Sequence, residues 1–331
     1  MSRIIKWGIL GCGKIARKFA ADLTLVTDAK LVAVGAREQE SATIFAKEFA
    51  VSNVHSSYES LVKDAEVDVI YVATPHALHH EHVILCLRNN KAVLCEKAFS
   101  INLREAKEMV VLARSKNIFL MEAFWTRFLP HYQKIKDFIT EGKVGNIKYI
   151  YAEFGFKPTP PVSQRLYDAA LGGGSLLDIG VYPVFLALDL LGKPDQIYAT
   201  MTPSPTGVDR QCSILFQYQH GAVVNLFSTF DTNLATGADI AGDLGRLRLT
   251  HRFHGPTTHV EYYPGIIDTK QEIEFEKAIG NGYEYEAKHV TECLQKGLTE
   301  SPIRKLEDTL LLMETLDEIR RVAGITYPAD K

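Results

Sequence analysis

Cysteine is scarce in this chain of 331 residues, and the five cysteines show no pairing pattern. They are scattered, with no CxxC motif, at Cys12, Cys86, Cys95, Cys212 and Cys293. An odd, widely spread set is typical of reduced thiols in a cytoplasm and argues against a disulfide framework or a zinc site. We therefore expect a cytoplasmic protein with no bound metal.

Long apolar runs and blocks of like charge are also missing. No run of about 18 apolar residues is evident, so the sequence predicts no membrane span. Glycines interrupt the N-terminal apolar stretch too early for a signal peptide. The formal net charge is −3 without a basic block. This charge pattern argues against a nucleic-acid partner.

The length exceeds what a single core fills, since cores stop growing near roughly 250–300 residues. Residues 1–122 alternate short apolar runs with helical patterns, which predicts an α/β fold with an N-terminal Rossmann, doubly wound parallel sheet. Residues 123–331 contain several strand-like runs separated by turn residues. They predict a C-terminal α+β domain with a large, mostly antiparallel open sheet. The last helix, expected over 305–322, could also pack back on the Rossmann domain.

The segment Gly11-Cys12-Gly13-Lys14-Ile15-Ala16 has the pattern GxGxxA between a predicted strand and a predicted helix. In this pattern Gly11 permits a tight turn, Gly13 leaves room for a pyrophosphate, and Ala16 allows close packing of the helix. The helix N-terminus offers N–H groups to the phosphates. The pattern favours a nicotinamide dinucleotide site, with a simple glycine turn as the alternative.

The end of the second predicted strand concerns the choice between NADP and NAD. NAD sites carry an acid about 20 residues after the glycines. Here Arg37 ends the strand and Glu38 follows it. A guanidinium can pair with a 2′-phosphate, so we expect NADP, with Ser41 adding a hydroxyl. Alternatively Arg37 is a surface charge and Glu38 binds the ribose of NAD.

Polar and aromatic side chains follow three consecutive predicted strands, where open parallel sheets bind their ligands. The three segments begin at Thr74, Glu96 and Glu122. The residues expected to contact the cofactor there are Thr74, Pro75, His76, His79, Glu96, Lys97 and Arg127. A lone Glu–Lys pair is more often a surface ion pair, but Lys97 ends a buried strand, which favours a functional role.

A further candidate site lies in the glycine-led segment Gly172–Pro183. Asp178 and Tyr182 are four residues apart, so a helix would place them on one face. Their neighbours are apolar, so that face is expected to be sheltered. The spacing is equally compatible with a capping aspartate and a core tyrosine.

These motifs resemble the Gfo/Idh/MocA family of oxidoreductases. The resemblance covers essentially the whole chain and rests on GCGKIA, ATPHALHH, CEKAFS and GGGSLLDIGVY. Within the family the sequence is similar to the dimeric dihydrodiol dehydrogenases, which also act as NADP-dependent D-xylose dehydrogenases. That similarity rests on KAVLCEK, FLMEAFWTRF, LLDIGVY and YEAKHVTECLQKGL.

The resemblance implies roles for individual residues. Lys97 corresponds to the lysine of the EKP motif, which here reads Glu96-Lys97-Ala98 and whose peptide bond can be cis in the family. Asp178 corresponds to the aspartate of D-x-x-x-H, and Tyr182 replaces the histidine. Substrate contacts are implied for His79, Trp125 and Phe154. The resemblance also implies a homodimer, or a higher homo-oligomer, through the C-terminal sheet.

A coherent reaction follows from these residues. A free tyrosine has a pKa near 10, too high for a base at neutral pH, and a neighbouring lysine ammonium would lower it. We therefore expect Tyr182 to be the general acid–base, with Lys97 as the alternative, and Asp178 to orient the lysine or the substrate hydroxyl. This reaction requires Lys97 and Tyr182 to meet at the nicotinamide.

The expected function is transfer of hydride between NADP(H) and a hydroxyl-bearing carbon of a sugar, polyol or cyclic trans-dihydrodiol. Two alternatives stay open. The first is another enzyme with the same site, such as an NAD-dependent inositol-type or other sugar dehydrogenase, or an imine or biliverdin-type reductase. The second is a non-catalytic dinucleotide sensor.

Overall fold

The computed structural model describes residues 3–265 and 269–331. Their contacts group into two compact units. The first contains residues 1–128 and 279–310, and the second contains 129–278 and 311–331. The chain therefore returns to the first unit after passing through most of the second.

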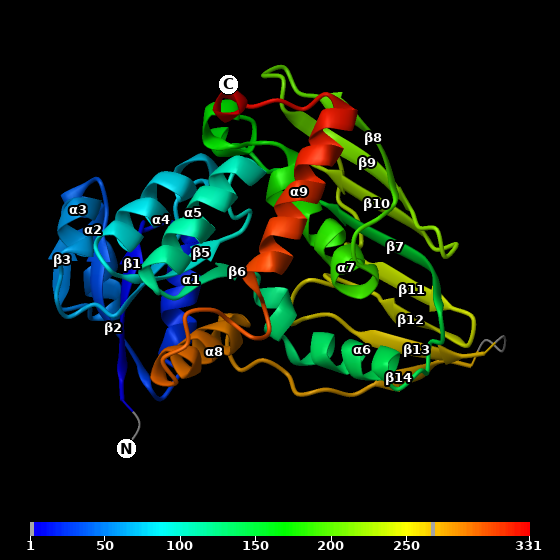
Figure 1. The fold of residues 1–331 in the computed structure, drawn as a ribbon, viewed down its shortest axis with the longest axis horizontal. Helices are drawn as coiled ribbons and strands as arrows, with labels where there is room; N and C mark the ends of the chain where they lie inside the picture. Colours follow the sequence, from blue (N-terminus) through cyan, green and yellow to red (C-terminus); the bar gives the residue numbers. More distant parts are fainter. Residues whose placement is uncertain (1–2, 266–268) are drawn as a thin grey trace. The chain divides into compact units, whose positions relative to one another are not determined.

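The first unit contains a six-stranded parallel sheet in the order β3-β2-β1-β4-β5-β6 (Figure 1). This order reverses direction between β1 and β4, as in a Rossmann sheet. The predicted doubly wound parallel sheet is thus confirmed. Its strands are β1 (Ile5–Leu10), β2 (Ala29–Gly35), β3 (Asn53–His55), β4 (Val69–Val72), β5 (Ala92–Glu96) and β6 (Leu120–Ala123).

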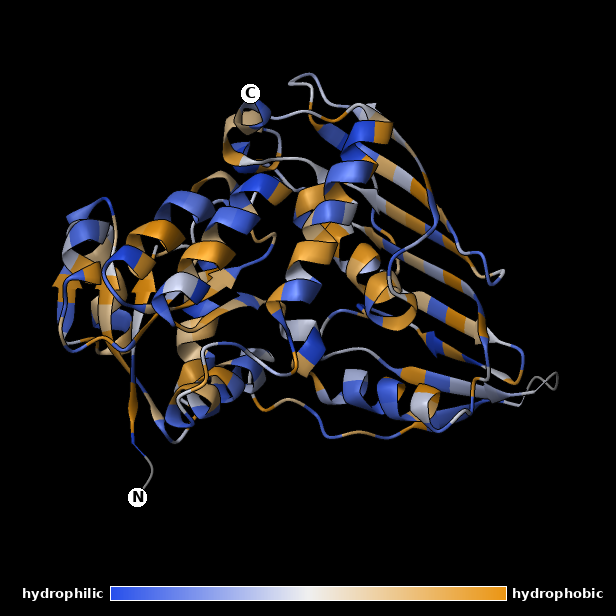
Figure 2. Cartoon of the chain, viewed as in Figure 1, coloured by the Kyte–Doolittle hydropathy of each residue, from blue (hydrophilic) through white to orange (hydrophobic). Residues whose placement is uncertain are grey.

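Helices cover both faces of this sheet. Helices α1 and α8 contact each other on one side, and α4 contacts α3 and α5 on the other. The helices are α1 (Lys14–Leu23), α2 (Gln39–Phe49), α3 (Tyr58–Val62), α4 (His79–Arg88), α5 (Leu103–Lys116) and α8 (Tyr283–Gln295). Every residue of β4 and β5 is buried, as expected for parallel strands covered on two faces. Figure 2, in the same view as Figure 1, shows much apolar colour on the strands near β1 and β2.

The N-caps of α5 and α2 differ in how well they follow the preference for asparagine and serine at that position. Asn102 caps α5, because its side chain accepts a hydrogen bond from the backbone N–H of Glu105 at 3.0 Å. Ser41 does not cap the second helix, although serine favours that position, since Glu38 occupies the N-cap of α2. Ser41 lies inside the first turn, and its hydroxyl donates to the Glu38 carboxylate at 3.4 Å.

The second unit is built on an eight-stranded sheet in the order β14-β13-β12-β11-β7-β10-β9-β8. Every pairing in it is antiparallel except that of β7 with β10. The predicted large, mostly antiparallel sheet is confirmed. The strands are β7 (Ile147–Gly155), β8 (Gln196–Pro203), β9 (Asp209–Gln217), β10 (Val223–Thr229), β11 (Ala238–Gly242), β12 (Gly245–Leu249), β13 (Val260–Pro264) and β14 (Gln271–Ile273).

Helix α7 (Val181–Leu191) contacts β7 and β10 from the inner face of this sheet. It continues a π-helical turn over Leu176–Gly180. The unit also contains α6 (Pro130–Thr140). Helix α9 (Leu306–Ala323) begins in the first unit and continues into the second.

The segment Ala169–Leu191 is long and apolar enough to cross a membrane by composition, with a mean hydropathy of 1.6. The glycines and Asp178 interrupt the apolar residues without lowering their average much. In the structure 78% of the apolar window is buried inside the protein, as in a core helix, so the composition is weak evidence for a membrane span.

Candidate active site

The GxGxxA turn fits the phosphates of a dinucleotide. Gly11 has φ +102°, and a Cβ there would lie 3.1 Å from the Ala73 carbonyl oxygen, so the turn requires glycine. Gly13 is the N-cap of α1 without a side-chain cap, and a Cβ on it would meet nothing within 4 Å among the described residues. Ala16 is fully buried, which allows α1 to pack closely. A phosphate can therefore approach the N–H groups of the first turn.

The other residues of this turn differ in how far they are exposed. Lys14, the first residue of α1, is exposed. Cys12 and Ile15 are partly buried and pack against the core of the first unit. Burial raises the pKa of the Cys12 thiol to about 11, with Arg17 partly offsetting it, so the thiol stays protonated at neutral pH. Cys12 therefore acts as a small apolar residue beside the turn.

The end of β2 leads to an exposed Arg37. Tyr58, at the start of α3, lies beside this guanidinium. Burial raises the pKa of Tyr58, and the nearby Arg37 partly offsets that rise. The two charged groups at this strand end therefore have different partners: the Glu38 carboxylate accepts from the Ser41 hydroxyl, and the Arg37 guanidinium lies beside the Tyr58 hydroxyl.

His79 is fully buried between two strand ends. Its Nδ1 lies 2.8 Å from the Ala98 carbonyl oxygen, and its Nε2 lies 2.8 Å from that of Thr74. Burial lowers the pKa of His79 to about 4, so the ring is neutral at pH 7 and donates to one of the two carbonyls at a time. His79 links the loop after β4 to the loop after β5.

The neighbours of His79 complete the end of β4. His76 is buried, with its ring edge-on to His79 at a centroid distance of 5.8 Å. The Thr74 hydroxyl lies 2.9 Å from Nδ1 of His82, and Pro75 is partly exposed. Thr74, His76 and His79 thus form one cluster at the carboxyl edge of the sheet.

Lys97 is the one partly exposed residue in the buried segment 92–100. The peptide bond between Lys97 and Ala98 is cis. The Lys97 backbone N–H donates to the Glu96 carboxylate at 3.2 Å, and Glu96 also accepts from the Tyr71 hydroxyl. Burial raises the pKa of Glu96 to about 6, partly offset by these contacts. The surroundings therefore fix the backbone at Lys97 while its side chain reaches the surface.

The end of β6 has a different character. Trp125 stacks on Tyr283 of α8, with ring centroids 4.5 Å apart and planes 8° apart. Glu122 forms a buried ion pair with Arg304 and accepts from Thr309 at 2.9 Å. Arg127, in the short helix Trp125–Phe128, is partly buried. The residues at and after the end of β6 therefore attach the returning residues 279–310 to the sheet of the first unit.

In the second unit Asp178 lies within the π-helical turn. Its carboxylate forms an ion pair with Arg165 at 3.1 Å, and the Asp178 side chain is 12% exposed. π-Helical turns occur frequently at functional sites. The predicted simple α-helical spacing of Asp178 and Tyr182 is therefore replaced by a turn that passes from π to α between them.

Tyr182 is nearly buried in an aromatic cluster. Its ring lies 4.6 Å from that of His254 and 5.8 Å from that of Phe154, between centroids. Phe154 and His254 stack on each other at 4.4 Å. The structure thus brings together Tyr182 and Phe154, both predicted, with a third ring.

The sequence patterns did not identify His254 or Arg165. His254 follows an irregular segment, and Arg165 follows a proline-containing stretch, so neither belongs to a periodic pattern. Both come from loops whose position is set by long-range packing. Their closeness to a predicted residue is the only signal that could have found them, and it is spatial.

The described residues contain no group of three or more His, Cys, Asp or Glu side chains that could hold a metal ion. The fold and the glycine turn define an NAD(P)-binding oxidoreductase. The NAD-binding Rossmann model of the oxidoreductase family matches residues 5–124, and the GFO/IDH/MocA C-terminal domain matches residues 132–248. The chain belongs to the Gfo/Idh/MocA family, as its motifs suggested.

Curated relatives are similar over nearly the full length. Trans-1,2-dihydrobenzene-1,2-diol dehydrogenases from Xenopus tropicalis and Bos taurus are each 38% identical, covering 98% and 99% of this chain and 99% of each relative. The protein is accordingly a dehydrogenase-type enzyme.

Solved structures agree on the fold. A 3-ketoreductase from Actinomadura kijaniata, in complex with NADP, has a TM-score of 0.87 at 27% identity, covering 96% of this chain and 98% of that one. An aldose–aldose oxidoreductase from Caulobacter crescentus has a TM-score of 0.88 at 22% identity, covering 97% and 98%. This second similarity concerns the fold alone.

Proposed function

We propose that this protein is an NADP-dependent dehydrogenase acting on a hydroxyl-bearing carbon of a sugar, polyol or cyclic trans-dihydrodiol. The observation that carries the proposal is the enclosure of Tyr182 by Phe154 and His254, close in sequence to Asp178. A sheltered phenol among aromatic rings suits the binding of a ring-shaped substrate and the transfer of a proton. The names of the relatives point to the same substrate class.

In the oxidation direction Tyr182, as phenolate, takes the proton of the substrate hydroxyl. The Lys97 ammonium favours that phenolate, and Asp178 orients the lysine or the hydroxyl. The nicotinamide supplies the hydride acceptor or donor. Solved forms of the neighbouring ketoreductase include variants of one lysine and of one tyrosine. These are the two residue types that the proposal places at the reacting hydroxyl.

His79 takes a positioning role in this proposal. A ring with no exposed surface cannot touch a substrate in this conformation, so its contact with the Ala98 carbonyl replaces the predicted substrate contact. His79 would hold the backbone beside Lys97. Trp125 and Phe154 remain the proposed substrate-contact residues, and Thr74, Pro75, His76, Glu96 and Arg127 remain proposed cofactor neighbours.

We propose NADP as the preferred cofactor because Arg37 is exposed at the end of β2, while Glu38 is engaged by Ser41. Initial rates with D-xylose, D-glucose, inositol and a trans-dihydrodiol, each with NADP and NAD, test both cofactor and substrate. We expect kcat/KM with NADP to exceed that with NAD by at least about tenfold. A tenfold preference for NAD would overturn the assignment, and NADPH binding without turnover of any substrate would favour a sensor.

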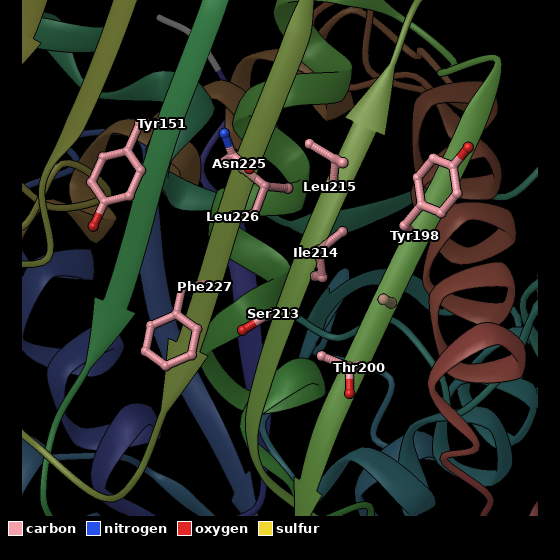
Figure 3. Close-up of a pocket in the computed structure, with 10 residues that line it drawn as sticks. Tyr151, Tyr198, Thr200, Ser213, Ile214, Leu215, Asn225, Leu226 and Phe227 are labelled. Carbon is pink, nitrogen blue, oxygen red and sulfur yellow. The ribbon is translucent and has the colours of Figure 1, made fainter.

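A homodimer through the eight-stranded sheet is proposed as the assembly. The sheet face remote from α7 carries apolar and aromatic residues, among them Tyr151, Tyr198, Leu215 and Phe227 (Figure 3). They line a depression of about 540 Å³. Because Tyr151 and Phe154 point to opposite faces of β7, this depression is separate from the aromatic cluster at Tyr182. A second copy would cover it.

A cytoplasmic location is also proposed. The five cysteines are all free, and four of them are buried. Free buried thiols suit a reducing compartment.

A further inference from the structure

The carboxyl of Asp209, the first residue of β9, lies buried beneath the glycine loop that precedes the π-helical turn. Its Oδ2 accepts a hydrogen bond from the Ser175 hydroxyl at 2.7 Å and one from the Leu176 backbone N–H at 2.7 Å. The Ser175 hydroxyl also lies 2.9 Å from that of Ser228 on β10. A distant strand thus provides the acceptor for the start of the helical segment.

The Asp209 carboxyl replaces the side-chain N-cap that the helical segment lacks. Ser175 occupies the N-cap position but makes no side-chain capping bond of its own. The first N–H groups of a helix need an acceptor when they are buried. The Asp209 carboxyl satisfies the one at Leu176, so the start of the segment that carries Asp178 and Tyr182 is fixed from β9.

The loop closes tightly on the same carboxyl. Gly174 has φ +114°, and a Cβ on it would lie 2.3 Å from Asp209 Oδ1. The carbonyl of Gly173 accepts a hydrogen bond from the Tyr327 hydroxyl at 2.6 Å. The loop is therefore held by Asp209 on one side and by the C-terminal segment on the other.

The groups around Asp209 explain its charge state. Ser175 and Ser228 are neutral, and Cys212 on β9 and Tyr327 are the titratable neighbours, with Arg320 and Asp330 beyond Tyr327. Burial raises the pKa of Asp209 to about 7, partly offset by the bonds from Ser175 and Leu176. Asp209 Oδ1 has no hydrogen-bond partner among residues 3–265 and 269–331. A proton can sit on Oδ1 while Oδ2 keeps both bonds.

We propose that Asp209 is a positioning residue of the redox reaction, fixing the backbone that places Asp178 and Tyr182. The inference rests on the proposed function, because the proposed function assigns proton transfer to Tyr182 and orientation of the lysine or the substrate hydroxyl to Asp178. A displacement of about 1 Å at a reacting group can cost about 10²-fold in rate. Loss of the cap would therefore lower turnover without touching the cofactor-binding glycine turn.

Two substitutions separate positioning from simple stabilisation. Asp209→Ala removes the acceptor, and we expect kcat to fall by roughly 10–100-fold while KM for NADP changes by less than about 2-fold. Asp209→Asn keeps an acceptor oxygen and resembles the protonated acid, so it should retain kcat within about 3-fold. The substrate is whichever of D-xylose and trans-1,2-dihydrobenzene-1,2-diol the wild type oxidises.

Ser301→Ala provides the matched control, because the buried Ser301 hydroxyl accepts from the backbone N–H groups of Ile303 and Arg304 in the first unit. It should lower stability but leave kcat of the folded enzyme unchanged. Unchanged kcat in Asp209→Ala, or an equal loss in the alanine and asparagine variants, would overturn the proposal.

Hydrogen exchange distinguishes this inference from the proposed function. We expect the amides of residues 175–182 to exchange faster in Asp209→Ala than in wild type. If the wild type oxidises no substrate, the proposed function fails, and the exchange result still decides on Asp209. Unchanged exchange in that segment would show that Asp209 does not hold it.

Discussion

At the scale of single residues, Tyr182 is distinguished by its neighbours. Its ring is nearly buried against Phe154 and His254, and Asp178 beside it in sequence is paired with Arg165. Asp178 and Tyr182 were singled out by the resemblance of GGGSLLDIGVY to the family, because their spacing alone is equally compatible with a core tyrosine. The neighbours could not, because they come from loops distant in sequence.

Tyr182→Phe removes the phenolic hydroxyl and keeps the ring packing. We expect turnover to fall by roughly 10²–10⁴-fold, the usual contribution of a general acid–base. Steady-state kinetics with saturating NADP and the best substrate measure the effect. Thermal unfolding should stay close to wild type, and near-normal turnover would transfer the proton-transfer role to Lys97.

Arg37→Ala removes the proposed partner of the 2′-phosphate. We expect KM for NADP to rise by roughly 10–100-fold, since hydrogen bonds to charged groups contribute about 1.5–3 kcal/mol. KM for NAD should change little, because NAD lacks that phosphate. Parallel titrations with the two cofactors measure the difference, and an equal rise for both would contradict the assignment.

At the scale of elements, the glycine loop and the π-helical turn are both held in place by contacts with Asp209. Gly173 lies in close backbone contact with residues 165–168, and Gly174 adopts a positive φ against Asp209. The sequence indicated a glycine-led helix from Gly172. The π turn was not predictable, because it depends on the acceptor supplied from β9.

Gly174→Ala would both strain the backbone and collide with Asp209. We expect it to lower the free energy of unfolding by more than about 2 kcal/mol, since unfavourable backbone conformations cost about 1–3 kcal/mol each. Gly297→Ala is the control, with φ +68° and nothing within 4 Å of its Cβ among the described residues. Chemical denaturation measures both, and equal losses would show that the contact with Asp209 does not matter.

Helix α6 is attached to the second unit by a buried histidine. His131 Nε2 donates to the Phe253 carbonyl at 3.0 Å, and burial lowers the pKa of His131 to about 4 from an ordinary value of 6.5. The folded protein favours the neutral ring, so its stabilising effect is complete above pH 6.5 and is lost as the pH falls towards 4.

His131→Gln keeps a hydrogen-bond donor but does not titrate. We expect wild type to lose on the order of 3 kcal/mol more stability than this variant between pH 6.5 and pH 4. Urea unfolding at several pH values measures the two slopes. Parallel slopes would mean that His131 has the same pKa in the folded and the unfolded protein, which contradicts the expected shift.

At the scale of the whole molecule, the chain builds two units, and the first is completed by residues 279–310. Within it, Asp22 on α1 accepts hydrogen bonds from the backbone of Asn281 and Tyr283 at the start of α8. The helical pattern of α8 is visible in the sequence. Its location is not, because one amphipathic face is compatible with many apolar surfaces.

The proposed dimer gives a prediction at this scale. Phe227→Glu places a charge in the middle of the proposed interface, and we expect the dissociation constant to rise by at least about 100-fold. Light scattering during size exclusion should then give the mass of one chain, 37.0 kDa, in place of twice that mass.

Ile44→Glu is the control for this experiment, because Ile44 is an apolar residue on α2 that is 53% exposed outside the proposed interface. It should leave the mass unchanged. A wild type that is monomeric at micromolar concentration would contradict the proposed interface.

The sequence by itself determined the family, through the resemblance of its motifs. It also determined the glycine turn and both sheets, because glycine geometry and apolar periodicity are local properties of the chain. Only the tertiary structure decided the surroundings of the reactive groups: the burial of His79, the rings around Tyr182 and the carboxyl beneath the glycine loop. Burial, pKa and hydrogen-bond partners depend on residues brought together from distant positions, and no local pattern encodes that proximity.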